Sequence, residues 1–82
     1  MNEQDKLLVE TMYNAFLNAI HKMCDDSEET KAEMEYIKYG LELLKKDSDP
    51  KIYSRYAMMW AAYYYGIDFG LEITRIVAGE TT

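Results

Sequence analysis

Two side chains that could do chemistry lie three residues apart, His21 and Cys24. At this spacing they share one face of a helix, so an imidazole and a thiol could bind a metal ion or act as base and nucleophile. A closed zinc site needs four ligands, and the chain has no second histidine or cysteine, although Asp25 could be a third ligand. We therefore expect no metal or other cofactor, a packed Cys24 and a partly exposed His21.

Carboxylates are the other candidates for catalysis, because 15 of the 82 residues are Asp or Glu. The densest group, in residues 25–29, lies at an expected helix start, where capping and the helix dipole already account for it. General acid–base catalysis needs carboxylates in differing, partly buried environments. The sequence also has no phosphate-binding glycine loop, nucleophile elbow or dinucleotide fingerprint. It therefore predicts a protein that is not an enzyme and has no catalytic residues.

The negative charge is concentrated in the first part of the chain. Residues 1–49 hold twelve acidic and six basic residues, so the whole net charge of −6 belongs to this part. Direct binding to nucleic acid needs clustered Lys and Arg and is disfavoured by this balance. A protein partner with a basic surface is favoured instead.

The sequence also bears on the compartment. Cys24 is the single cysteine, which fits a reducing compartment and predicts a cytoplasmic protein. The longest uncharged run, residues 56–67, is well short of the roughly 20 residues that cross a bilayer. The first residues do not read as a signal peptide. We therefore expect no membrane contact.

Hydrophobic residues recur every three or four positions along most of the chain, which is typical of amphipathic helices on a shared core. The sequence predicts an all-α fold, a three-helix bundle with helices at about residues 3–24, 28–46 and 50–78, in one domain of residues 1–82. The apolar positions of the first two helices are Val9, Tyr13, Phe16, Ile20 and Met23, then Met34, Ile37, Leu41 and Leu44.

Capping residues set the expected helix ends. Asn2 is the expected cap of the first helix, and Ser48 or Asp49, followed by Pro50, begins the third. Gly79 is a natural stop. The candidate caps of the second helix are Asp25, Asp26 and Ser27.

Glycines inside two helices predict close packing. Gly40 costs roughly 1 kcal/mol against alanine within a helix, so we expect another helix to approach it closely. In the third helix a row of small residues spaced by four predicts a groove for a neighbouring helix, in the same chain or in a homodimer. The row consists of Ala62, Gly66, Gly70 and Thr74.

A helical wheel of residues 50–78 divides the third helix into two faces. The positions predicted to be buried are Ile52, Tyr56, Met59, Tyr63, Gly66, Ile67, Gly70, Ile73, Thr74 and Val77. The positions predicted to face solvent are Ser54, Ala61, Tyr65, Asp68, Glu72 and Arg75. Tyr53 and Tyr64 are expected at the edge or outside. Since exposed tyrosines near a tryptophan are typical of binding hot spots, this outer face is a candidate partner-binding surface.

One segment carries a resemblance to known proteins. Tyr63-x-x-Gly66-Ile67-x-x-Gly70-x-x-Ile73 resembles an aromatic-x-x-Gly-Phe-x-x-Gly-x-x-Leu pattern in the last helix of small, uncharacterised helical proteins of Firmicutes and their phages and mobile elements. Those proteins often have a basic residue where this chain has Asp68. The resemblance implies a helical bundle in a bacterial or phage setting and assigns no activity. In size and acidity the chain is also similar to the inhibitors that phages use against host nucleases.

The leading hypothesis is a non-enzymatic protein–protein interaction module. Its specific version is a phage or mobile-element inhibitor of a host defence protein that handles nucleic acid, in which an acidic surface occupies a basic channel. That acidic surface consists of Asp25, Asp26, Glu28, Glu29, Glu33 and Glu35. A second candidate surface consists of Tyr53, Tyr64, Tyr65, Asp68 and Glu72.

The alternative hypothesis is a self-assembling structural or regulatory protein. In a domain this small the hydrophobic content, 49% of all residues, can be satisfied by other copies of the chain, for example in a homodimer through the third helix.

Overall fold

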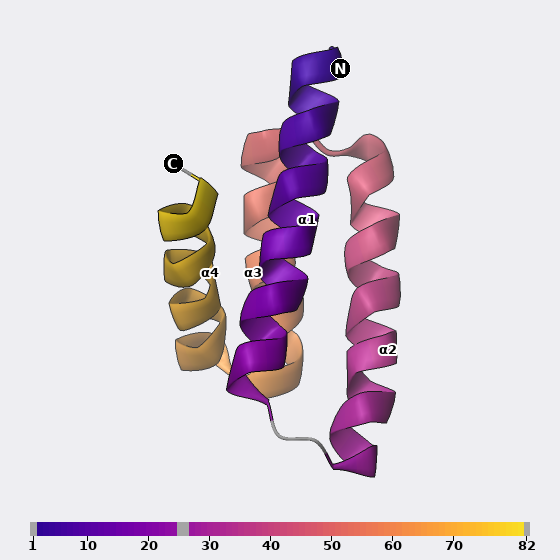
Figure 1. Cartoon of the computed structure of the whole chain (residues 1–82), viewed down its shortest axis with the longest axis vertical. Helices are drawn as coiled ribbons and strands as arrows, with labels where there is room; N and C mark the ends of the chain where they lie inside the picture. The colour runs from indigo at the N-terminus through magenta and orange to yellow at the C-terminus, as the bar shows by residue number, and fades with distance from the viewer. Residues whose placement is uncertain (1, 25–26, 82) are drawn as a thin grey trace.

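The computed structural model describes residues 2–24 and 27–81, and this part of the chain is folded into helices without any strand (Figure 1). The helices are α1 (Glu3–Met23), α2 (Glu28–Leu44), a short 3₁₀ helix η1 (Lys45–Asp47), α3 (Pro50–Tyr65) and α4 (Ile67–Thr81). The predicted all-α fold is confirmed. The predicted three-helix bundle is wrong, because the expected third helix is two helices.

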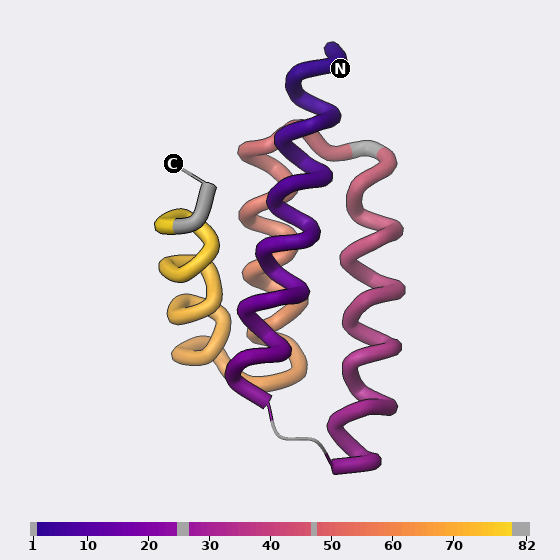
Figure 2. Tube along the Cα trace, viewed as in Figure 1, coloured from indigo at the N-terminus to yellow at the C-terminus, as the bar shows by residue number. Residues whose placement is uncertain are grey.

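Successive α-helices run in opposite directions (Figures 1 and 2). Helices α1 and α3 form a central pair, with α2 packed on one side and α4 on the other. The bundle is elongated, with extents of 39 × 22 × 18 Å. The end of α4 lies in the same half of the bundle as the start of α1, although the shorter α4 ends at a lower level in the view (Figure 1).

Side-chain caps begin three of the four described α-helices at positions that the sequence indicates. The Asn2 side chain accepts a hydrogen bond from the backbone N–H of Asp5 at 2.7 Å. Ser27 caps α2 in the same way, and Asp49 caps α3 through the N–H of Ile52 at 2.9 Å. Pro50 occupies the first turn of α3, where its missing N–H has no cost. The caps therefore confirm these three predicted starts.

Gly66 divides the predicted helix of residues 50–78. Its N–H donates to the Ala62 carbonyl at 2.8 Å and closes α3, and its own carbonyl accepts from the N–H of Gly70 at 3.0 Å and opens α4. Gly66 has φ 100° and ψ 159°, a region that is open almost only to glycine. One residue thus ends one helix, starts the next and reverses the chain direction.

The break at Gly66 also makes the predicted faces of α3 wrong. The prediction treats residues 50–78 as one continuous helix, whose buried side includes Ile73 and Val77. Because the helix breaks at Gly66, α3 turns a different side toward the core. As a result Tyr53 and Ala61, expected at the edge or in solvent, are fully buried. The positions predicted to be buried that are exposed are Ile52, Tyr56, Met59, Tyr63, Gly66 and Ile67.

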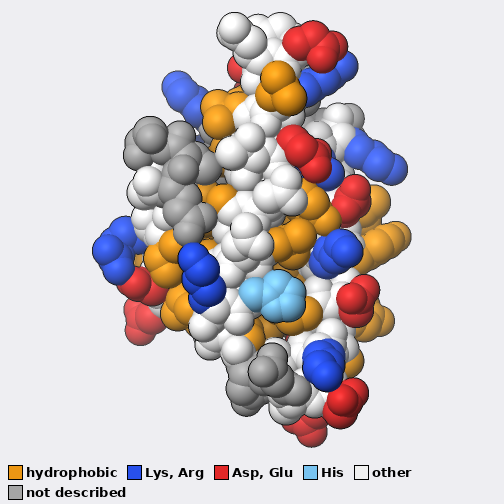
Figure 3. All heavy atoms as spheres, viewed as in Figure 1, with side chains coloured by type: hydrophobic (Ala, Val, Ile, Leu, Met, Phe, Trp, Pro, Cys, Tyr) orange, Lys and Arg blue, Asp and Glu red, His pale blue; other side chains and the backbone are white. Residues whose placement is uncertain are grey.

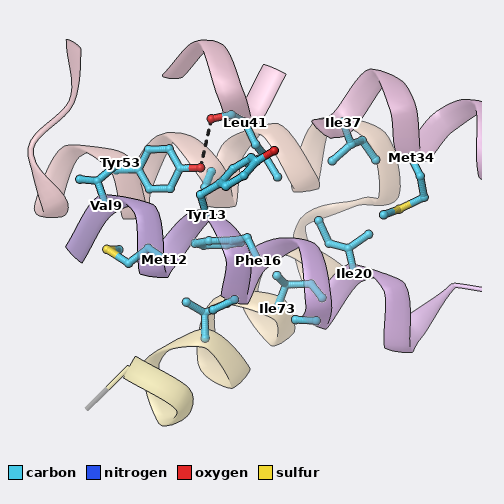
Figure 4. Close-up of a cluster of buried hydrophobic side chains, with 14 residues drawn as sticks. Val9, Met12, Tyr13, Phe16, Ile20, Met34, Ile37, Leu41, Tyr53 and Ile73 are labelled. Carbon is cyan, nitrogen blue, oxygen red and sulfur yellow. Dashed lines mark hydrogen bonds between the residues drawn. The ribbon is translucent and has the colours of Figure 1, made fainter. Parts of the chain in front are cut away.

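The core lies between the central pair and α2, with α4 closing it from the other side (Figure 4). Its largest fully buried side chains are Phe16, Ile20, Ile37, Leu41, Tyr53 and Ile73. Phe16 and Tyr53 pack edge to face with ring centroids 6.4 Å apart. The Tyr53 hydroxyl donates to the Leu41 carbonyl at 3.1 Å, so this buried polar group is satisfied.

Small residues let α3 and α4 approach closely, but in a different way from the predicted groove. A Cβ added at Gly70 would lie 2.9 Å from both the Ala62 Cβ and the Met58 carbonyl oxygen. Ala62 and Gly70 therefore pack against each other across the chain reversal. The half-buried Thr74 donates to the Gly70 carbonyl at 2.8 Å. The groove prediction is wrong for Gly66, because a Cβ there would meet no atom within 4 Å.

Candidate functional site

His21 and Cys24 do share one side of the chain, at a shallow hollow of about 370 Å³ between α1 and α2. In Figure 3 the single histidine lies among hydrophobic side chains on this face. Apolar Leu17 and Met34 form much of the hollow, and Lys31 and Glu35 border it. The described residues include no group of three or more potential metal ligands.

The structure describes four of the six residues of the predicted acidic surface. Glu28, Glu29, Glu33 and Glu35 are all exposed on the N-terminal half of α2, whereas Asp25 and Asp26 lie outside the described residues. The structure does not gather the four glutamates on one side. Glu29 and Glu33 are on the side of α2 that leads to Gly40, and Glu28 and Glu35, seven residues apart, are on another. Lys31 lies 3.5 Å from Glu28 and partly compensates its charge.

The second predicted surface does not form. Tyr53 is buried, and Tyr64 and Tyr65 are half-buried, with the Tyr65 hydroxyl itself enclosed. Burial, followed by the neighbouring Cys24, raises the pKa of Tyr65. Asp68 is exposed, as predicted, and Glu72 pairs with Arg75 within the same helix, an interaction that lowers the pKa of Glu72. Of these five residues only Asp68 is exposed, so they do not form one exposed surface.

A polar network joins α1 to the C-terminal end of α2. The Tyr13 hydroxyl donates to the Glu42 carboxylate at 2.7 Å, and the Lys45 ammonium donates to Glu10 at 2.8 Å. Lys45 also lies 3.3 Å from Glu42 and 4.1 Å from the centroid of the Tyr13 ring. Burial and the bond to Glu42 raise the pKa of Tyr13 to about 12, and the same bond lowers the pKa of Glu42. Because each member is paired with another, the network fastens helices rather than offering a reactive group.

The feature that stands out is an exposed apolar surface where α2 meets α3. We call it the seam face and define it by Tyr36, Leu43, Ile52, Tyr56, Met59 and Tyr63. The first two side chains belong to α2 and the other four to α3. Tyr63, Tyr36 and Met59 are the most exposed, at 80%, 67% and 61%. Six exposed hydrophobic side chains on two neighbouring helices of a small domain are typical of a binding surface.

Gly40 and Trp60 form the join beneath the seam face. A Cβ at Gly40 would overlap the Trp60 indole ring, so the glycine makes room for it, as its position inside a helix predicts. The indole N–H donates to the Ile37 carbonyl at 3.1 Å and fixes the ring. Trp60 stacks with Tyr63 at 6.3 Å and meets Tyr64 edge to face at 5.2 Å. The Trp60 side chain beneath the seam face is thus fixed by contacts with both α2 and α3.

Helices α2 and α3 each place two seam-face residues at the same spacing from the residue at the join. Tyr36 and Leu43 lie four residues before and three after Gly40, and Tyr56 and Tyr63 stand in the same relation to Trp60. Each pair therefore lies on the same side of its helix as the residue at the join. Between the helices, a depression of about 310 Å³ is lined almost wholly by apolar atoms of Leu44, Tyr56, Met59, Trp60 and Tyr63.

Charged residues mark the two ends of the seam face. Glu29 and Glu33 continue the line of Tyr36 and Gly40 toward the start of α2, and we call them the acidic end. Since α2 and α3 are antiparallel, the start of α3 lies at the opposite end, where exposed Lys51 and Arg55 border Ile52. We call these two residues the basic end. Asp49 also lies there, with its carboxylate engaged in capping α3.

Comparison of the chain with models of known protein families, with curated protein sequences and with solved structures gives no match. In the described part of the chain, no helix is both long and apolar enough to cross a membrane.

Proposed function

We propose that the chain is a non-enzymatic protein–protein interaction module that binds through the seam face. The single observation that carries this proposal is the group of exposed tyrosine, methionine and aliphatic side chains over the α2–α3 join. In the described part of the chain the buried core is formed by other side chains, so those of the seam face are available for contact with a partner.

The composition of the seam face supports protein binding. Tyrosine and tryptophan offer large, rigid contact areas with few rotatable bonds, and they are enriched at binding hot spots. Met59 adds a flexible apolar side chain that adapts to different partner shapes. The depression beside Trp60 offers a pocket for one anchoring side chain of the partner.

The acidic end defines the kind of partner. Glu29 and Glu33 lie beside the apolar surface, so the partner carries basic residues next to an apolar stripe. An inhibitor of a host protein that handles nucleic acid is one form of this module, because its acidic end would compete for a basic groove.

Capture experiments test the proposal. We compare the wild-type chain with Met59→Glu/Tyr63→Glu, which places two charges on the seam face, and with the control Leu7→Glu/Leu71→Glu, which changes two exposed leucines of α1 and α4. Each immobilised chain is exposed to an extract of the cells that encode it, and the retained proteins are purified and titrated against all three chains.

We expect a partner that binds the wild type and the control and loses at least tenfold in affinity for the seam-face variant. Circular dichroism confirms that all three chains are folded. Equal affinity of a purified partner for the folded seam-face variant and the wild type would refute the proposal.

A further inference from the structure

We propose that the seam face also binds a second copy of this chain, with the two copies related by a two-fold axis that sets their helices antiparallel. The inference rests on the proposed function, because it uses the same surface, and it names one partner for that surface. The resulting interface is isologous, with the same residues contributed by each copy.

The first support is the exposed surface area. The accessible surface of the chain is 5615 Å², whereas a folded monomer of 9.6 kDa exposes about 5,100 Å² by the usual scaling with mass. The chain therefore exposes more surface than this scaling gives for a monomer of its mass, and the seam face contributes six exposed hydrophobic side chains on two neighbouring helices.

The second support is charge complementarity along the seam face. Glu29 and Glu33 lie at one end, and Lys51 and Arg55 lie at the other. When a two-fold axis lies in the plane of the face and runs across its two helices at mid-length, the acidic end of each copy faces the basic end of its partner. A parallel arrangement would bring like charges together, which disfavours it. The charges therefore select the antiparallel pair.

The size of the face sets the expected strength. It extends along two helices of 16 and 17 residues, about 25 Å long and roughly 20 Å wide for two adjacent helices. A face with this length and width covers a smaller area than the roughly 800 Å² that each partner buries in a standard interface. We therefore expect a reversible dimer with a dissociation constant in the micromolar range.

Sedimentation equilibrium from about 5 µM to 1 mM tests the inference. We expect the wild type to pass from monomer to dimer over this range, and Met59→Glu/Tyr63→Glu to stay monomeric. The control Leu7→Glu/Leu71→Glu should dimerise like the wild type, because it leaves the seam face unchanged.

Charge exchange tests the antiparallel arrangement. We expect Arg55→Glu alone and Glu29→Arg alone to weaken the dimer by about tenfold at low salt, because each replaces two attractions per dimer with two repulsions. An equimolar mixture of the two single variants should restore dimerisation, since every contact is again between opposite charges. Unchanged affinity in both single variants would refute the antiparallel pair.

The outcomes separate the two proposals. If the wild type is monomeric at 1 mM while the seam-face variant loses a purified foreign partner, the dimer is refuted and the proposed function stands. If seam-face substitutions change neither foreign binding nor dimerisation, both proposals are refuted. If the wild type dimerises and only the seam-face variant is monomeric, the inference is supported.

Discussion

At the scale of single residues, Gly40 lowers the stability of α2 locally but makes room for Trp60, which supports the seam face. Glycine inside a helix is unfavourable by roughly 1 kcal/mol against alanine. Its missing side chain makes room for an indole ring that would otherwise overlap a Cβ. The indole then supports Tyr63, the most exposed residue of the seam face.

We expect Gly40→Ala to lower the free energy of unfolding by about 1–3 kcal/mol, because displacing the indole costs more than the gain in helix propensity. Urea unfolding followed by circular dichroism measures the change, and the fluorescence of the single tryptophan reports its displacement. Gly79→Ala is the matched control, since its Cβ meets no atom within 4 Å and it should be at least as stable as the wild type. Equal stability of Gly40→Ala and the wild type would contradict this account.

Single residues also show what the sequence can predict. The capping roles of Asn2 and Asp49 and the close approach at Gly40 follow from residue type and local position, and the structure confirms them. The exposure of Tyr56 and Tyr63 does not follow in this way. Tyrosine is common both in cores and at surfaces, so its place depends on how the whole helix is oriented.

At the scale of helices, the orientation of α3 is decided by Gly66. Apolar periodicity continues through this residue, so residues 50–78 read as one helix. Only the backbone conformation, with φ 100°, reveals the reversal. A glycine inside an apolar run predicts close packing equally well, and Gly70 four residues later does pack closely. The four-helix arrangement and the seam face could therefore not be predicted from the periodicity alone.

We expect Gly66→Ala to lower the free energy of unfolding by about 1–3 kcal/mol through backbone strain, although there is open space around the position. Replacement of Gly66 by D-alanine through chemical ligation is the control, because a D-residue adopts positive φ without this strain. Urea unfolding of the two proteins measures the difference. Equal stability of the L- and D-alanine proteins would show that backbone conformation is not the cause.

At the scale of the whole molecule, the chain carries a net charge of −6. One of its carboxylates, that of Glu42, joins α2 to α1 through the hydrogen bond from Tyr13. Hydrogen bonds from Tyr13 and Lys45 hold the pKa of Glu42 below its ordinary value of 4.5. As the pH falls through 4.5, the unfolded chain takes up this proton before the folded chain does. The stability that Glu42 contributes is therefore present above this pH and lost below it.

We expect Glu42→Gln to be less stable than the wild type at pH 7, although glutamine can still accept the hydrogen bond from Tyr13. The difference should shrink as the pH falls from about 5 to 3, because the wild-type carboxylate becomes neutral as well. Urea unfolding at several pH values measures it. Glu29→Gln controls for the loss of one exposed charge. A difference that is the same at pH 7 and pH 3 would contradict the role of the network.

The alternating directions of the four helices have a further consequence for the connectivity of the chain. Because the start of α1 and the end of α4 lie in the same half of the bundle, a flexible linker can join them (Figure 1). The chain could then be opened at the connection between α1 and α2, at the opposite end. The bundle is thus suited to circular permutation, which would keep every helix while changing the order in which they are synthesised.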